Sequence, residues 1–100
     1  MPWFVYILFC DQKTYYVGIT QNIQQRMYSH KAKRNIATKE FSDIKLVYTE
    51  NYQTRLFAEK REKQLKKWTA AKKKALIQGN KRLLIQLSKT RSLVDGESRT

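Results

Sequence analysis

Apolar positions are uninterrupted near the start of the chain and then give way to alternation. Residues 3–9 read WFVYILF, a run of aromatic and β-branched side chains without a polar break. Such a run is typical of a strand covered on both faces. The polar stretch CDQKT has hairpin length, and YYVGIT at residues 15–20 reads as a second short strand. The pattern predicts an antiparallel hairpin, in which Gly18 marks a bulge or a close backbone approach.

The next segments predict a helix and a third strand. The sequence QNIQQRMYSHKAKR at residues 21–34 indicates a helix with Thr20 as its N-cap. Ile23 and Met27 are four residues apart, so both are expected to face the core. After a loop, IKLVYTE at residues 44–50 alternates well enough for a strand, whose buried candidates are Ile44, Leu46 or Val47, and Tyr48.

From Gln53 onward the apolar spacing becomes helical. One broad apolar face is marked by Phe57, Ala58, Leu65 and Trp68. A second helix, TAAKKKALIQ, is expected to start from Thr69 as its cap and to stop near Gly79. The stretch KRLLIQL after Asn80 is compatible with a last short helix.

The predicted element order is ββαβαα, followed by this optional short helix. It indicates an α+β fold, in which a small three-stranded, mainly antiparallel sheet is flanked by helices. One hundred residues suit one domain, with little room for a second core. We expect that domain to span residues 1–88 and the polar residues 89–100 to form a flexible tail.

Two features bear on the compartment. Cys10 is the only cysteine, which excludes an intrachain disulfide and fits a small buried residue in a reducing cytosol. The N-terminal apolar run is short, whereas a membrane-spanning helix needs roughly 20 apolar residues. The sequence therefore predicts a cytoplasmic protein that does not enter the membrane.

The charge of the chain is strongly one-sided. Lys and Arg outnumber Asp and Glu by 21 to 8, and residues 55–91 alone hold thirteen bases and two acids. Ordinary solubilising charge mixes both signs, so this excess favours a polyanionic partner, most often nucleic acid. The candidates for phosphate-backbone contacts are Lys60, Lys63, Lys66, Lys67, Lys72 and Lys73. The open alternative is a solvated or ribosome-bound basic surface.

Glu62 stands out within the basic segment. It falls between Ala58 and Leu65 on the apolar side of the predicted helix. A carboxylate there needs a partner. That partner is either a neighbouring Lys or Arg, or a hard divalent cation such as Mg²⁺ that also keeps waters and substrate phosphates as ligands.

Other residues that could carry chemistry are Arg26, His30 and two tyrosines. Arg26 and His30, the only histidine, are four apart and share a helix face. Tyr15 and Tyr16 alternate along a strand, so they point to opposite faces. A phenol, an arginine, a histidine and a glutamate become informative together only if they converge in space.

The chain resembles the GIY-YIG nuclease superfamily, in particular its small single-domain bacterial proteins. Phe4-Val5-Tyr6 takes the place of the first signature triplet, and Tyr16-Val17-Gly18 the place of the second, ten residues further on. Arg26 and His30 match the arginine and histidine of the family's following helix. The Ala-x-x-Arg-Glu-x-x-x-Lys pattern of the small branch is matched by Ala58, Arg61, Glu62 and Lys66, and a later asparagine by Asn80.

The resemblance spans roughly residues 3–87 and implies metal-dependent hydrolysis of phosphodiester bonds in DNA. It implies that Glu62 holds Mg²⁺ or Mn²⁺, that Arg26 binds the phosphate, and that Asn80 gives a supporting hydrogen bond. Tyr6 or Tyr16 would orient the attacking water and take its proton, helped by His30; the sequence leaves open which tyrosine does so. The family register places Tyr16 at the site and leaves Tyr15 to packing.

The leading alternative is a nucleic-acid-binding module with the same fold and weak or no catalysis. Ile19 follows the second triplet, where some active relatives carry a Lys or His. A third reading, a protein-interaction or ribosome-associated basic domain, needs neither the tyrosines nor Glu62. Oligomeric state and the natural substrate stay open. The geometric expectation of the nuclease reading is one cleft shared by Tyr6, Tyr16, Arg26, His30 and Glu62.

Overall fold

A computed structural model describes residues 2–33 and 38–87 of the chain, which divides into two compact units, residues 1–67 and 68–100. The first unit carries strands β1 (Trp3–Cys10), β2 (Thr14–Thr20) and β3 (Ile44–Tyr52) with helices α1 (Ile23–Lys31) and α2 (Arg55–Lys66). The second carries α3 (Ala70–Ile77) and a helical segment at residues 81–87. The α+β fold and its element order are confirmed, including the last short helix. The predicted tail at 89–100 lies outside the described residues.

The sheet is antiparallel, with the strand order β2-β1-β3. β1 is the central strand, which explains its unbroken apolar sequence: Val5 to Leu8 are all buried. Tyr6 pairs with Gly18 of β2, and Leu8 pairs with Tyr16. Directly paired residues share a face of the sheet, so these four positions lie on the same face. The hairpin prediction is confirmed, and its register brings both signature triplets together.

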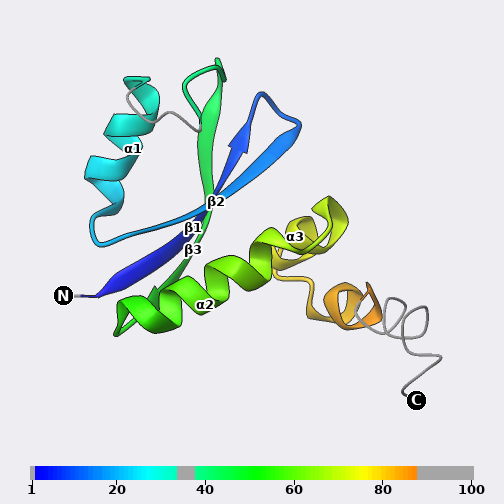
Figure 1. Cartoon of the computed structure of the whole chain (residues 1–100). Coiled ribbons are helices and arrows are strands. Elements are labelled where there is room, and N and C mark those ends of the chain that lie inside the picture. Colours follow the sequence, from blue (N-terminus) through cyan, green and yellow to red (C-terminus); the bar gives the residue numbers. More distant parts are fainter. Residues whose placement is uncertain (1, 34–37, 88–100) are drawn as a thin grey trace. The chain divides into compact units, whose positions relative to one another are not determined.

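Helices α1 and α2 cover opposite faces of this sheet (Figure 1). On the α1 face, a core cluster is formed by Tyr6, Leu8, Cys10 and Ile44, with Tyr16, Ile23, Met27 and Phe41 packed against it. On the other face, α2 buries Ala58 and Leu65. The predicted burial of Cys10 is confirmed, and Ile23 and Met27 face the core as predicted, each of them half-buried.

Helix α1 begins later than the sequence suggested. Its N-cap is Asn22, whose side chain accepts a hydrogen bond from the Gln25 amide, and the helix ends at Lys31. Thr20 was the wrong cap: it is the last residue of β2, and its hydroxyl oxygen accepts from the Asn22 amide. Thr20 therefore belongs to β2 and not to the start of α1.

On the third strand Ile44 is buried as predicted, and Val47, not Leu46, is the less exposed of the two alternatives, whereas the apolar prediction for Phe57 on α2 was wrong. A register shift between Ile7 and Leu8 of β1 interrupts the pairing with β3. Leu46 is 39% exposed beside that irregularity, while Val47 and Tyr48 are half-buried. Phe57 is 56% exposed, because it lies in the first turn of α2 and off the line of Ala58 and Leu65. Trp68 lies beyond the end of α2.

Helix α3 of the second unit begins at its predicted cap. The Thr69 hydroxyl accepts from the Lys72 amide and starts α3, which ends before Gly79 in the left-handed region at φ +70°. Asn80 then caps the segment 81–87 through a side-chain hydrogen bond from the Leu83 amide. None of the helices described has the length and apolar sequence that crossing a membrane requires.

Candidate functional site

A cleft of about 440 Å³ in the first unit gathers most of the predicted site residues. The sheet contributes two of them from adjacent strands, and one comes from each of the helices α1 and α2. They are Tyr6, Tyr16, Arg26 and Glu62. The ordered motifs of the sequence thus converge in space, which spacing alone could not establish.

His30 lies behind Tyr6 rather than on the cleft wall. It is fully buried, and its Nε2 atom is 2.9 Å from the Tyr6 hydroxyl oxygen. Its Nδ1 atom is 2.6 Å from the Thr38 hydroxyl oxygen, in the turn that follows α1. Tyr16 completes the group, with its ring centroid 5.5 Å from that of His30 and 6.4 Å from that of Tyr6. The result is a buried chain of hydrogen-bonding groups that runs from the cleft through Tyr6 and His30 to Thr38.

Gly18 is required for the position of the Tyr6 phenol. A Cβ atom at Gly18 would lie 2.5 Å from the Tyr6 hydroxyl oxygen and 2.6 Å from Cζ, far inside van der Waals contact. The close approach predicted at this glycine is therefore made by a tyrosine ring of the neighbouring strand.

Burial and charge set the protonation of this group. Burial raises the pKa of Tyr6 well above that of a free phenol; Tyr16 adds to the increase, and the Arg26 charge opposes it. The pKa of His30 is lowered, first by burial and then by the positive charge of Arg26. At neutral pH the imidazole is neutral and the Tyr6 phenol is protonated. In one tautomer, Nε2 accepts the Tyr6 O–H while Nδ1–H donates to Thr38.

The lowered pKa of His30 predicts a pH-dependent stability. The unfolded chain takes up a proton on this residue near pH 6.5, and the folded protein takes it up only at a lower pH. The free energy of unfolding should therefore fall as the pH decreases below about 6.5. Urea denaturation at several pH values measures this, and His30→Gln should flatten the difference between pH 7 and pH 5. An equal slope in the variant would contradict the assignment.

Glu62 lies on the wall of the cleft next to a lysine. Its side chain is 18% exposed, lines the cleft, and lies 3.2 Å from the exposed Lys66 ammonium. The partner predicted as a neighbouring Lys or Arg is therefore present as Lys66, while the adjacent Arg61 is paired with Glu50. Among the described residues no three His, Cys, Asp or Glu side chains gather as a metal cage. A single carboxylate fits Mg²⁺ or Mn²⁺, which retain waters and phosphate oxygens as their remaining ligands.

Ile19, which follows the second triplet, also lines the cleft, and three further cleft residues were not identified from the sequence: Trp3, Arg55 and Glu59. The Arg55 guanidinium lies 5.3 Å from the Trp3 ring centroid and pairs with Glu59 at 3.0 Å. The spacing of 55, 59 and 62 on one helix face could have shown that Arg55 and Glu59 accompany Glu62. Thr38 gave no such signal, because it lies in a turn without periodicity.

The remaining predicted residues lie elsewhere. Four of the six basic candidates, Lys60, Lys63, Lys66 and Lys67, are exposed in or at the end of α2. Lys72 and Lys73 are half-buried in α3, with the Lys72 ammonium 4.3 Å from the Trp68 ring centroid. Asn80 belongs to the second unit, where it caps a helix. The roles predicted for these residues in binding or catalysis stay predictions.

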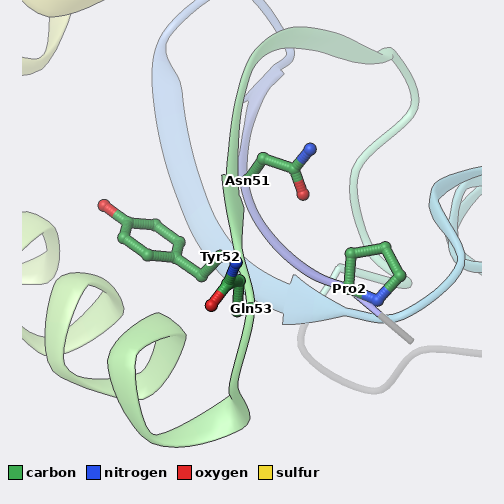
Figure 2. Close-up of a pocket in the computed structure, with 4 residues that line it drawn as sticks. All are labelled: Pro2, Asn51, Tyr52 and Gln53. Carbon is green, nitrogen blue, oxygen red and sulfur yellow. The ribbon is translucent and has the colours of Figure 1, made fainter.

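A second hollow in the first unit is larger but lacks this chemistry. It has a volume of about 490 Å³ and is lined by Pro2, Asn51, Tyr52 and Gln53 near the end of β3 (Figure 2). Among the described residues that line it there is no carboxylate, histidine or basic side chain. The smaller cleft is therefore the candidate functional site.

A three-stranded antiparallel sheet between two helices, with a cleft lined by phenols, arginine and glutamate, defines a small α+β domain with a polar cleft. The chain belongs to the GIY-YIG family, since the family's sequence model, described as the GIY-YIG catalytic domain, matches residues 2–75. This confirms the resemblance seen in the sequence. Family membership indicates a nuclease-like domain that acts on nucleic acid.

Named relatives cover most of the chain. The UPF0213 protein of Syntrophus aciditrophicus is 40% identical over 79 residues, which cover 77% of this chain and 91% of the relative. The UPF0213 protein of Desulfotalea psychrophila is 35% identical over 82 residues, or 80% of this chain and 74% of the relative. The solution NMR structure of a UPF0213 protein from Bacillus halodurans is similar, with a TM-score of 0.51 and 26% identity, over 78% of this chain and 84% of that one.

Proposed function

We propose that this protein is a metal-dependent endonuclease that hydrolyses phosphodiester bonds of DNA in the cleft between α1 and α2. The observation that carries the proposal is the convergence of Tyr6, Tyr16, Arg26 and Glu62 on that cleft. Family membership supports it at the level of a nuclease-like domain. Exposed lysines of α2 would supply sequence-independent contacts to the phosphate backbone.

Each side chain has a role that follows from its chemistry. Glu62 would hold Mg²⁺ or Mn²⁺, which when bound polarises the scissile phosphate and stabilises the leaving oxygen. Arg26 presents a guanidinium to the phosphate oxygens as negative charge develops. A phenol of the cleft orients the attacking water and takes its proton as the new P–O bond forms and the bond to the leaving oxygen breaks.

Tyr6 needs its hydrogen-bonded neighbours for that task. Its raised pKa keeps the phenol protonated in the protein alone, so it does not stand ready as a phenolate. Neutral His30 can accept the phenolic proton at Nε2, which frees the Tyr6 oxygen to accept a proton from water. Arg26 lowers the pKa of the same phenol and thereby assists this transfer.

The protonation state of Tyr6 supports a second candidate function. A protonated, buried phenol next to the apolar Ile19 also suits a module that binds nucleic acid without cutting it. Such a module would use the exposed lysines and would leave the cleft idle. Its binding would not depend on a divalent cation.

A cleavage assay separates the two. Purified protein is incubated with single-stranded, duplex, flap and branched DNA in Mg²⁺, in Mn²⁺ and with a chelator. Nicks or cuts are expected only with metal, and Arg26→Ala purified in parallel should lower the rate by about a hundredfold. That variant also controls for contaminating nuclease. Tight binding by wild-type protein with every substrate left intact would contradict the proposal and favour the binding module.

A further inference from the structure

A half-buried carboxylate on the α2 face of the sheet accepts four hydrogen bonds. Glu50 of β3 accepts from Arg61 of α2 twice, Nε to Oε1 and Nη2 to Oε2, each at 2.9 Å. The hydroxyls of Tyr48 and Tyr52 donate to the same carboxylate at 2.5 and 2.7 Å. The Glu50 and Arg61 side chains are only 17% and 21% exposed. This bidentate pair fixes the orientation of a helix against a strand.

The strand presents these groups on one side. Tyr48, Glu50 and Tyr52 alternate along β3 and therefore face α2 together. Figure 2 shows Tyr52 and Asn51 pointing to opposite sides of β3, as this alternation requires. The cluster is thus separated from Tyr6, which lies on the α1 face of the sheet. Glu50 does not line the cleft that holds Tyr6 and Glu62.

Helix geometry connects the two sides. Ala58 and Leu65 are seven residues apart and fully buried, so they define the line along which α2 contacts the sheet. At about 100° per residue, Arg61 lies about 50° to one side of that line and Glu62 about 50° to the other. A roll of α2 that takes Arg61 away from Glu50 therefore turns Glu62 relative to the cleft. Ala58 is too small to prevent such a roll by itself.

We propose that Glu50 is a positioning residue: its two bonds to Arg61 fix the rotation of α2 and so hold the Glu62 carboxylate in the cleft. This inference rests on the proposed function, because it gives Glu62 a task there. An ion pair largely shielded from solvent is weak evidence for added stability, whereas setting register is its better-supported use. Buried Ala58 and Leu65 already hold α2 against the sheet. The Glu50–Arg61 pair is therefore proposed to set the rotation of α2 about its own axis.

The test compares Glu50→Gln with Gln64→Ala. Glu50→Gln keeps the volume but places an amide donor against the Arg61 donors. Gln64→Ala removes the third Arg61 contact, from Nη1 to the Gln64 side-chain oxygen at 2.8 Å, and leaves both Glu50 bonds. The readouts are kcat and KM at saturating Mg²⁺, with folding verified by circular dichroism, and the metal-free crystal structure of each variant.

For Glu50→Gln we expect kcat to fall by about a hundredfold, the effect of roughly 1 Å of misplacement, with KM nearly unchanged. Its crystal structure should show the Glu62 carboxylate turned out of the cleft while Ala58 and Leu65 stay buried. Gln64→Ala should keep both kinetic constants. If Glu50→Gln does not fold, Arg61→Lys gives the same test, because lysine keeps the charge but cannot form two parallel bonds.

Two results would overturn the inference: an unmoved Glu62 in Glu50→Gln, or a kcat equal to that of Gln64→Ala. If wild-type protein cleaves nothing, the proposed nuclease function fails on its own. The crystal structures then decide whether Glu50 positions Glu62, since they need neither metal nor substrate.

Discussion

Glu62→Gln should abolish metal-dependent cleavage while leaving the fold and DNA binding in place. The Glu62 carboxylate is proposed to hold Mg²⁺ or Mn²⁺ in the cleft, and an amide is a far weaker ligand for a hard cation. Metal stabilisation of the transition state amounts to several kcal/mol. At tenfold per about 1.4 kcal/mol, we expect a loss in kcat of about a thousandfold or more. Single-turnover cleavage of labelled DNA measures it.

The fold should tolerate this change. Glutamine keeps the size of the side chain, and the lost pair with Lys66 is a surface ion pair whose lysine is 54% exposed. Such pairs contribute at most about 1 kcal/mol to the free energy of unfolding. Binding of DNA in the absence of metal should be equal or tighter, since one negative charge has been removed from a basic surface.

Glu59→Gln is the matched control for Glu62→Gln. Glu59 lines the same cleft one turn earlier on α2, and its carboxylate is paired with Arg55 at 3.0 Å. The substitution changes the cleft charge by the same amount. We expect a loss in kcat of less than about tenfold, because this substitution changes only the electrostatic potential in the cleft. Equal losses in the two variants would show that charge in the cleft, and not metal ligation by Glu62, governs the rate.

The parts of the fold that follow from local patterns could be predicted from the sequence. The apolar run of β1 requires cover on both faces, and the central strand of the sheet provides it. Thr69 and Gly79 bound α3 because a cap and a left-handed residue act within a few positions of chain. Where two elements compete for one residue, local rules fail. Thr20 satisfies the rule for a cap, but the pairing with Phe4 keeps it in β2.

Some residues of the candidate site could also be predicted from the sequence. Tyr6, Tyr16, Arg26 and Glu62 occupy ordered motif positions, and the sheet register brings them together. The residues that support the site, Thr38 and Glu50, belong to no sequence motif. Thr38 reaches His30 from a turn, and Glu50 meets Arg61 only because β3 and α2 pack face to face. Long-range contacts of this kind depend on register and helix rotation, which periodicity does not specify.

The structure also sharpens the choice between the two tyrosines, and Tyr6→Phe should reduce cleavage more than Tyr16→Phe. Tyr6 has the hydrogen-bonded route for a proton, from its hydroxyl to His30 and on to Thr38. Loss of a positioned general base lowers the rate by about 10²–10⁴-fold. We expect Tyr6→Phe to lower kcat in that range at unchanged DNA affinity, and Tyr16→Phe to have a smaller effect. The reverse order would assign the base to Tyr16.

The dependence of kcat on pH gives an independent test of proton transfer from Tyr6 to His30. His30 can accept the phenolic proton only while its imidazole is neutral, and burial lowers the pKa of that imidazole below its usual 6.5. Wild-type kcat should therefore hold its value as the pH falls through 6.5 and decline only at lower pH, as His30 becomes charged. His30→Gln should lose this acid limb together with most of the rate. A wild-type profile that declines already above pH 6.5 would exclude neutral His30 as the proton acceptor, because its lowered pKa leaves it uncharged there.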